Sequence, residues 1–397
     1  MGKTRGRRAG RRRGRTALVC AGGGVTGAVY EIGCLRALED LLDRSVLDFD
    51  LYVGVSGGAF VASMLAAGVS PLEMYQAVSA RKPGAGWDDR LLFRLGAAEF
   101  ARRSARAPRI LARAARETLA GRPPSLSDLA LSFLQALPAG LLDSSGLQEY
   151  VAATLRRRGL ADSFEALPRE LYLVSVDLDR GEAVAFGDRG HRDVPVSRAV
   201  QASAALPGLY RPVRIGGRDY VDGGVKKTAH INLAIRKGAD LVVCINPIVP
   251  LRNDVDGGAF GGHLSEKGLN WVLDQVLRIT LHGRMEYGLE RYRSEHPGVD
   301  VLVLQPTRDE MGMFRHNIMR YSARRVVAEY GYRSARDAFR RNRARYTRVF
   351  ARHGIRVGAP AALPDAPEGA PSGSEVGRHL GLSLERLEGR LRSARRA

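Results

Sequence analysis

The chain has 397 residues but only three cysteines, Cys20, Cys34 and Cys244. A disulfide framework or a cysteine-rich zinc site needs closely spaced cysteine pairs, and these three are scattered. The eight histidines form no H-E-x-x-H pattern and no cluster with the cysteines. We therefore expect a protein of a reducing compartment that holds no metal and no cofactor.

Lysine and acidic residues are also scarce relative to arginine. Only six of the 62 basic residues are lysine, and 42 acidic residues leave a net charge of +20. This balance excludes an acidic, calcium-buffering protein and leaves nucleic acid, anionic lipid or a phosphate-bearing substrate as partners. A GC-rich genome also produces an arginine-rich chain, so the charge alone identifies no partner. The hydrophobic share of 45% excludes disorder as the main state.

One segment resembles an export signal and another is long enough for a membrane span, but the sequence of each favours a different interpretation. Residues 1–15 carry eight cations and precede the uncharged stretch 16–30, as in a twin-arginine signal peptide. Cleavage there would remove the glycine motif described below, so we expect a cytoplasmic protein with a basic tail. Residues 51–72 are uncharged and long enough to cross a bilayer, but their four glycines favour a buried strand followed by a helix.

Apolar runs that alternate with helical patterns predict the fold class. A strand at 16–20 precedes a helix at 28–42, and a strand at 50–55 precedes a helix that extends to residue 67. This alternation is typical of α/β proteins whose mostly parallel sheet is covered on both faces. Further strands are predicted at 170–176, 182–186, 213–215, 220–221, 241–245 and 299–304.

Composition divides the rest of the chain. We expect a flexible tail at 1–15, a helical insertion at 80–137, a basic helical extension at 307–357, and a linker with an amphipathic terminal helix at 358–397. The insertion mixes arginine with large apolar residues, and the terminal helix pairs a leucine face with arginines. Both suit peripheral contact with an anionic membrane, although a helix packed on the core and a solvated tail are the plainer alternatives.

The segment Gly54-Val55-Ser56-Gly57-Gly58 has the G-x-S-x-G pattern between a predicted strand and a predicted helix. Such a tight turn exposes the serine hydroxyl, and the glycines let neighbouring backbone pass closely. A helix that begins at Gly57 would also point its free N–H groups at the reacting centre. Glycine and serine are common turn residues, but this placement favours Ser56 as a nucleophile.

A second glycine motif, Gly22-Gly23-Gly24-Val25-Thr26-Gly27, lies between the first predicted strand and helix. Its G-x-G-x-x-G pattern fits dinucleotide binding in an oxidoreductase, or an oxyanion hole made of consecutive backbone N–H groups. Dinucleotide binding needs an acidic residue at the end of the next strand, which instead delivers the serine of the G-x-S-x-G segment. The second function is therefore favoured.

The third segment, Asp222-Gly223-Gly224, follows a predicted hairpin. On its own it is an ordinary Asp-Gly turn, but a carboxylate at a strand end with small residues behind it can approach another side chain closely. Beside a candidate nucleophile, Asp222 becomes the candidate base. Among the histidines only His230 lies close after this segment, and it is the alternative base.

Taken in this order, the three segments resemble the patatin-like phospholipase family. Residues 202–208, with the sequence ASAALPG, resemble the family's segment before the aspartate, and residues 137–143 also resemble family members. The likeness covers roughly residues 16–306. It implies a three-layer α/β/α sandwich and an acyl hydrolase that acts on phospholipid, lysophospholipid or other acyl esters.

The resemblance also implies roles for individual residues. Ser56 would attack the ester carbonyl, Asp222 would accept its proton, and N–H groups of Gly22, Gly23 and Gly24 would hold the oxyanion. The remaining motif glycines would support these parts: Gly27, Gly54, Gly57, Gly58, Gly223 and Gly224. One departure concerns Thr26, which stands where the family usually carries arginine or lysine, so another cation would have to substitute or the activity would be specialised.

The alternative to an enzyme is a non-catalytic, basic protein on the same scaffold that binds an anionic polymer. The arginine content suggests it, but no basic strand interleaved with aromatic residues supports nucleic-acid recognition. We therefore expect a lipid substrate, contact with an anionic membrane surface, and no nucleic acid.

Overall fold

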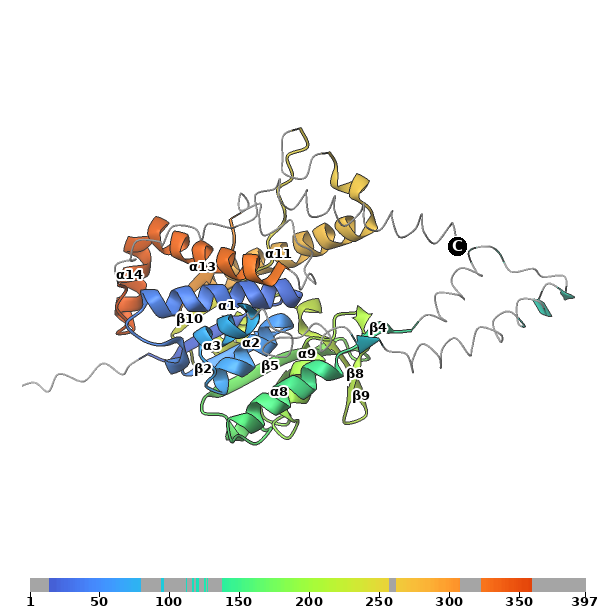
Figure 1. Cartoon of the computed structure of the whole chain (residues 1–397), viewed down its shortest axis with the longest axis horizontal. Coiled ribbons are helices and arrows are strands. Elements are labelled where there is room, and N and C mark those ends of the chain that lie inside the picture. Colours follow the sequence, from blue (N-terminus) through green and yellow to red (C-terminus); the bar gives the residue numbers. More distant parts are fainter. Residues whose placement is uncertain are drawn as a thin grey trace, which may run out of the picture. The chain divides into compact units, whose positions relative to one another are not determined.

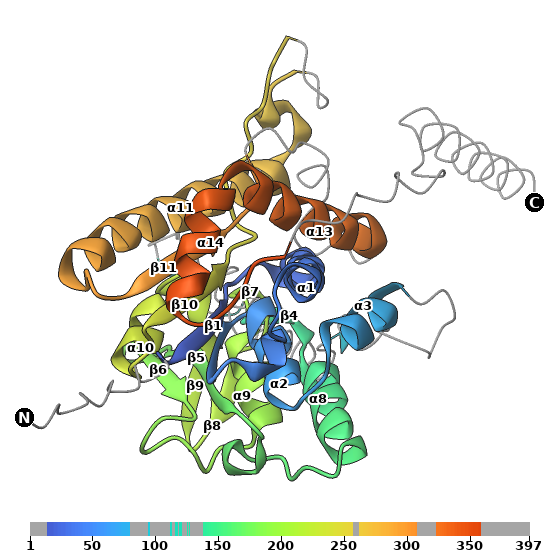
Figure 2. The same ribbon diagram turned by 90° about the vertical axis from the view of Figure 1, so that its left-hand side faces the viewer.

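The computed structural model describes residues 14–79, 94–95, 138–256, 262–307 and 323–358, with a few isolated positions between 112 and 127. Almost all of three predicted segments lies outside the described residues: the tail 1–15, the insertion 80–137, and the linker with terminal helix 358–397. The described part forms the three layers that the sequence predicts (Figures 1 and 2).

The middle layer is an eight-stranded sheet. Successive hydrogen-bonded neighbours follow the order β11-β10-β1-β2-β5-β9-β8, and β6 is also paired to β5. The strands β11, β10, β1, β2 and β5 run parallel, whereas β6, β9 and β8 are antiparallel to their neighbours. The mostly parallel sheet is thus confirmed. The strands are β1 Thr16–Cys20, β2 Leu51–Val55, β5 Glu170–Asp177, β6 Glu182–Phe186, β8 Val213–Ile215, β9 Arg218–Asp222, β10 Leu241–Ile245 and β11 Asp300–Leu304.

Helices cover both faces of this sheet (Figure 2). One face carries α1 Gly24–Leu41, α2 Gly57–Ala66, α3 Pro71–Ser79, α8 Ser145–Arg157, α9 Val196–Ser203, α13 Arg324–Arg341 and α14 Arg343–Arg352. The other face carries α10 Ile231–Arg236 and α11 Leu269–Glu295. The first helix begins at Gly24 rather than at the predicted residue 28, because it starts inside the glycine motif.

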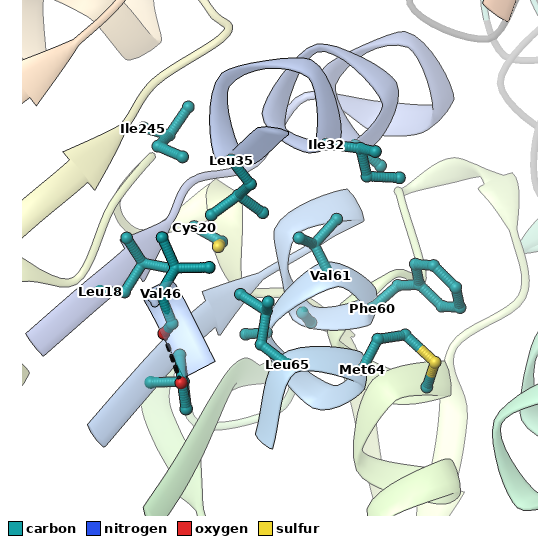
Figure 3. Close-up of a cluster of buried hydrophobic side chains, with 14 of the residues drawn as sticks. Leu18, Cys20, Ile32, Leu35, Val46, Phe60, Val61, Met64, Leu65 and Ile245 are labelled. Carbon is teal, nitrogen blue, oxygen red and sulfur yellow. Dashed lines mark hydrogen bonds between the residues drawn. The ribbon is translucent and has the colours of Figure 1, made fainter. Parts of the chain in front are cut away.

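Alternating side chains of the central strands enter two separate cores. In β1, Leu18 and Cys20 pack toward α1 and α2, whereas Ala17 and Val19 face the α10–α11 layer. Figure 3 shows Leu18 and Cys20 among side chains of α1 and α2. A strand buried on both faces must be apolar at every position, which is why it reads as a continuous hydrophobic run.

The basic helix α13 packs closely on α1 (Figure 1). A Cβ atom added to Gly331 would lie 2.2 Å from the carbonyl oxygen of Tyr30, and one added to Gly33 would lie 2.0 Å from that of Ala328. The Tyr30 hydroxyl donates to Ser334 Oγ at 2.8 Å. Glycines at the crossing therefore let two helix backbones meet directly, and α13 completes the layer that holds α1.

A second, three-stranded sheet consists of β3 Arg94–Leu95, β4 Gly140–Asp143 and β7 Gly208–Tyr210, and it was not predicted. These strands have two to four residues, too few for a periodic pattern to be recognised. Arg211 forms an ion pair with Asp143 at 2.6 Å beside this sheet. The sheet matters here because Tyr210 and the neighbouring Ser144 reach the cavity described below.

The uncharged segment 51–72 forms β2, α2 and the start of α3, as predicted. None of the described helices combines the length and the apolar character that a bilayer crossing requires.

Candidate active site

Ser56 occupies a strained turn between β2 and α2. Its φ of 55° and ψ of −128° make it the only non-glycine residue with positive φ in the described part of the chain. Such a conformation costs about 1–3 kcal/mol and persists only where the surrounding structure imposes it. The strain makes Ser56 a candidate functional position.

The flanking glycines make this turn possible because other backbone lies against them. A Cβ atom on Gly54 would stand 2.6 Å from Ala59 Cα, and one on Gly58 would stand 2.4 Å from the carbonyl oxygens of both Cys20 and Ala21. A Cβ atom on Gly57 would approach the Gly24 carbonyl oxygen to 2.3 Å. The G-x-S-x-G pattern thus presses the Ser56 turn against the 22–24 loop.

The sheet brings Ser56 and Asp222 to the same place. Val55 at the end of β2 pairs with Val174, and Asp222 at the end of β9 pairs with Ser175, the next residue of β5. Because β6 occupies the other edge of β5 over 173–177, β2 and β9 must share one edge. The two strands run toward each other along that edge, so their ends meet.

The segment 202–208 fixes both strand ends. The backbone N–H of Ser56 donates to Ser203 Oγ at 3.0 Å, and this hydroxyl donates to the Val174 carbonyl at 2.6 Å. Two residues further on, the Ala205 carbonyl accepts the backbone N–H of Asp222 at 2.9 Å. Sequence analysis recognised the segment by resemblance but gave Ser203 no role, because only its position in three dimensions reveals one.

Asp222 is buried, and its environment brings the pKa of the carboxyl close to neutral pH. Burial raises its pKa to about 6, although the nearby Ser56 side chain and the Gly224 N–H oppose this rise. The Gly224 N–H donates to Oδ1 at 2.7 Å, and Oδ2 has no hydrogen-bond partner within the described structure. Asp222 therefore has one oxygen fixed by backbone and one available to accept a proton.

The loop 22–24 lines the same cavity as Ser56 and Asp222, and its three backbone N–H groups differ in their hydrogen bonding. The Gly22 N–H donates to the Thr228 carbonyl at 2.9 Å, so it already has a partner. Neither the Gly23 nor the Gly24 N–H has an acceptor among the described residues. A Cβ atom on Gly23 would lie 2.6 Å from Pro247 Cγ, which explains a glycine there. Gly22 thus anchors the loop, while Gly23 and Gly24 keep free donors.

These parts line one predominantly apolar cavity. Ser56, Asp222 and Gly224 lie in its wall together with Gly22, Gly23, Gly24 and Gly57, whereas Gly27, Gly54, Gly58 and Gly223 pack behind it. No lysine or arginine of the described structure lines the cavity. None there therefore substitutes for the arginine or lysine that the family usually carries at the position of Thr26. The remaining wall is mainly apolar: Val25, Ala28, Phe60, Leu147, Tyr150, Ala204, Leu206, Tyr210, Val225, Ile248, Leu277 and Leu281.

His230, the alternative base, stands outside this wall. It is buried at the start of α10, in the segment that follows the Asp222 turn. Burial, with a smaller contribution from Lys227, lowers its pKa to about 4. Because its side chain does not line the cavity, His230 is a weaker candidate than Asp222 for the base that serves Ser56.

Within the described ranges, no group of three histidine, cysteine, aspartate or glutamate side chains is placed to hold a metal ion. The three cysteines, all within the described residues, are buried and form no disulfide.

Comparison with known families gives one match of high coverage. The family model described as patatin-like phospholipase matches residues 18–235, more than half of the chain. Two uncharacterised NTE family proteins, one from Mycobacterium bovis and one from Mycobacterium tuberculosis, are each 32% identical over 133 residues. The alignment covers 34% of this chain and 20% of each relative, so the chain spans about a fifth of their length.

Solved structures with a similar arrangement include two bacterial proteins and a human one. VipD from Legionella pneumophila is 16% identical, with a TM-score of 0.38 over 82% of this chain and 66% of its own. The type III effector ExoU of Pseudomonas aeruginosa is 13% identical, with a TM-score of 0.36 over 81% and 52%. Human GIVD cytosolic phospholipase A2 is 12% identical, with a TM-score of 0.34 over 86% and 61%.

The buried carboxyl predicts a pH-dependent stability difference. Its pKa of about 6, against an ordinary value of 3.8, corresponds to about 3 kcal/mol of unfavourable burial once Asp222 is ionised. Because the unfolded chain ionises first as pH rises, the contribution of Asp222 to the free energy of unfolding should fall between about pH 4 and about pH 6 and then level off. Asp222→Asn should remove this fall and be about 1–3 kcal/mol more stable at neutral pH.

Urea unfolding across this pH range measures the difference. The exposed Asp179→Asn variant is the control and should leave the free energy of unfolding within about 0.5 kcal/mol of wild type. An Asp222→Asn variant that is no more stable than wild type at neutral pH would contradict the burial cost.

Proposed function

The chain belongs to the patatin-like phospholipase family, and on that premise we propose that it is a serine acyl hydrolase. Its substrates would be carboxylic esters of phospholipids, lysophospholipids or other acyl lipids, as in phospholipase A or lysophospholipase reactions. The observation that supports this most directly is the meeting of a strained serine and a buried aspartate in one apolar cavity.

In the first half of the reaction Ser56 is the nucleophile and Asp222 the base. At neutral pH Asp222 is ionised, since its pKa is about 6, and its Oδ2 accepts the Ser56 hydroxyl proton. The serine oxygen then forms a bond to the ester carbonyl carbon. The carbonyl π electrons move to its oxygen, which becomes the oxyanion of a tetrahedral intermediate.

The oxyanion is bound by backbone rather than by a charged side chain. The free N–H groups of Gly23 and Gly24 are the donors, and Gly22 contributes by holding their loop through its bond to Thr228. The helices α1 and α2 both begin at this cavity, at Gly24 and Gly57, and add the positive ends of their dipoles. Each donor of this kind lowers the barrier by about 3 kcal/mol.

The intermediate collapses when the carbon–oxygen bond to the leaving alcohol breaks and the protonated Asp222 returns its proton to that oxygen. This leaves an acyl-serine. Water then attacks the acyl carbon, Asp222 accepts a proton from that water, and the Ser56 oxygen leaves with a proton. The same carboxyl thus serves as base and acid in turn, which a pKa near the working pH favours.

The cavity wall supports a lipid acyl chain as the bound group. Apart from the catalytic end, side chains such as Phe60, Leu147 and Leu206 would surround a hydrocarbon chain and exclude water from the ester. Burying each methylene of that chain contributes about 0.8 kcal/mol. A small polar ester would gain little from this wall.

We also propose that the enzyme works at an anionic membrane surface. Leu269, Leu273, Val276 and Ile279 of α11 are each more than half exposed and recur at helical spacing. The neighbouring face of the same helix lines the cavity through Leu277 and Leu281. An apolar helix face in water usually indicates a contact surface, and here it adjoins the site that would receive a lipid.

The hydrolase proposal predicts fatty-acid release from phospholipid or from p-nitrophenyl acyl esters. Ser56→Ala should lower kcat by at least about a thousandfold, because it removes the oxygen that attacks the ester, and Asp222→Asn should do nearly the same because it removes the base. The kcat/KM of wild type should fall about tenfold per pH unit below about pH 6, since only ionised Asp222 accepts the proton.

Circular dichroism of both variants provides the folding control. If folded Ser56→Ala kept wild-type turnover, the nucleophile assignment would be wrong. If wild type hydrolysed no ester and bound an anionic polymer instead, the alternative of a non-catalytic basic protein would take its place.

The membrane proposal predicts a position-specific loss of vesicle binding. Leu273→Asp should weaken binding to phosphatidylglycerol-containing vesicles about tenfold or more. It removes a leucine that the membrane would bury, and it adds a negative charge that the anionic lipid repels. Leu72→Asp on α3 is the matched control, since Leu72 is 47% exposed but lies on the other face of the sheet. Equal vesicle binding by the two variants in co-sedimentation would contradict this docking surface.

A further inference from the structure

A basic cleft lies next to the active-site cavity on its α10–α11 side. It is lined by the segment after Asp222, by α10 and by the second half of α11. Thr228 lies in the wall of both the cleft and the cavity. Against one acidic residue, Glu295, the wall of this cleft contains five cations: Lys226, Lys227, Arg236, Arg284 and Arg291.

Four of these five cations lack a carboxylate partner within the described structure. Only Arg291 has one, Glu295, at 2.6 Å. The Lys226 Nζ donates to the Gly181 carbonyl at 3.0 Å, and Arg284 donates to the Val225 carbonyl at 2.8 Å. Lys227 and Arg236, the other two, make no side-chain hydrogen bond or ion pair with described residues.

Many arginines elsewhere on the surface do find carboxylates. Arg158 pairs with Glu73 at 2.6 Å, and Arg214 pairs with Asp219 at 2.6 Å. The cleft is therefore a local excess of positive charge, and genome composition alone does not explain why these cations gather without counter-charges.

The cations in the cleft also act on one another. The pKa of Lys227 is lowered, first by partial burial and then by the charges of Arg236, Arg291 and Lys226. Asn232 and Tyr287 add neutral hydrogen-bonding groups to the same wall. A group with several negative oxygens would relieve this repulsion and accept hydrogen bonds from several sides.

We propose that this cleft binds a phosphate group with two negative charges, supplied by the headgroup of an anionic lipid or by a soluble phosphate. Arginine binds phosphate oxygens in a bidentate manner, and lysine adds a compact charge. The site is distinct from the cavity that holds Ser56, and its existence does not depend on the proposed hydrolase activity.

Its ligand would contact the chain segment on which the catalytic parts depend. Lys226 and Lys227 lie between Asp222 and Thr228, whose carbonyl accepts the Gly22 N–H of the oxyanion loop. The Thr228 hydroxyl donates to the Leu281 carbonyl of α11 at 2.9 Å. A phosphate held between this segment and α11 would therefore hold the base and the loop anchor in place.

The test measures binding rather than turnover, on the full chain carrying Ser56→Ala. Calorimetry with inorganic phosphate is one arm, and co-sedimentation with phosphatidylcholine vesicles containing phosphatidic acid is the other. The Lys227→Gln/Arg236→Gln double variant should weaken binding about tenfold or more, because it removes two charged donors that have no protein partners. The control is Arg156→Gln/Arg157→Gln in the last turn of α8, which changes the net charge equally.

Weakened binding in both arms supports a site for any phosphate group, and weakened binding to vesicles alone assigns the lipid headgroup. Equal affinity of the cleft and control variants in both arms, or no binding by the parent chain in either, would overturn the proposal. Thermal unfolding checks that both variants are folded. If the double variant is not folded, Lys227→Gln alone is compared with Arg156→Gln, with the same expectation in a smaller degree.

Discussion

The active site depends on one feature of the sheet, the meeting of two strand ends along one edge of β5. β2 ends opposite Val174 and β9 ends opposite Ser175, so neither strand can extend without displacing the other. The chain must turn away sharply at both ends, and these turns place Ser56 and Asp222 side by side. Ser203 and Ala205 then fix the two turns by hydrogen bonds to their backbone N–H groups.

The positive charge of the chain lies outside the candidate active-site cavity. The chain has a net charge of +20, yet no lysine or arginine of the described structure lines the cavity. Burial therefore raises the pKa of Asp222 with no cation in the cavity wall to oppose it. The excess positive charge instead gathers in places such as the cleft beside α10 and α11.

Much of the fold follows from patterns within single segments. The predicted strands agree with the observed ones within two residues, because a strand buried on both faces has to be a continuous apolar run. The tight turn at Ser56 is equally predictable from its glycines, because the backbone packed against Gly54 and Gly58 leaves no room for a side chain. These features depend on local backbone geometry, which the local sequence encodes.

The features that escaped prediction depend on contacts between distant segments. Nothing near Ser203 indicates that its hydroxyl accepts a hydrogen bond from a residue 147 positions earlier. The motif alone predicts equal roles for the three glycines 22–24, whereas the Thr228 carbonyl accepts the N–H of Gly22 and leaves the other two free among the described residues. His230 lies close to Asp222 in sequence, and only the structure places it behind the turn rather than in the cavity.

The most direct test of the account is to label the chain with a long-chain alkyl fluorophosphonate and to locate the adduct by mass spectrometry. The serine oxygen that attacks phosphorus displaces fluoride and stays bonded, so the reagent reports an activated serine without depending on the natural substrate. If Ser56 is the nucleophile and Asp222 its base, a single adduct forms on Ser56, and Asp222→Asn slows its formation strongly. An adduct on a different serine, with Ser56 unmodified, would contradict it.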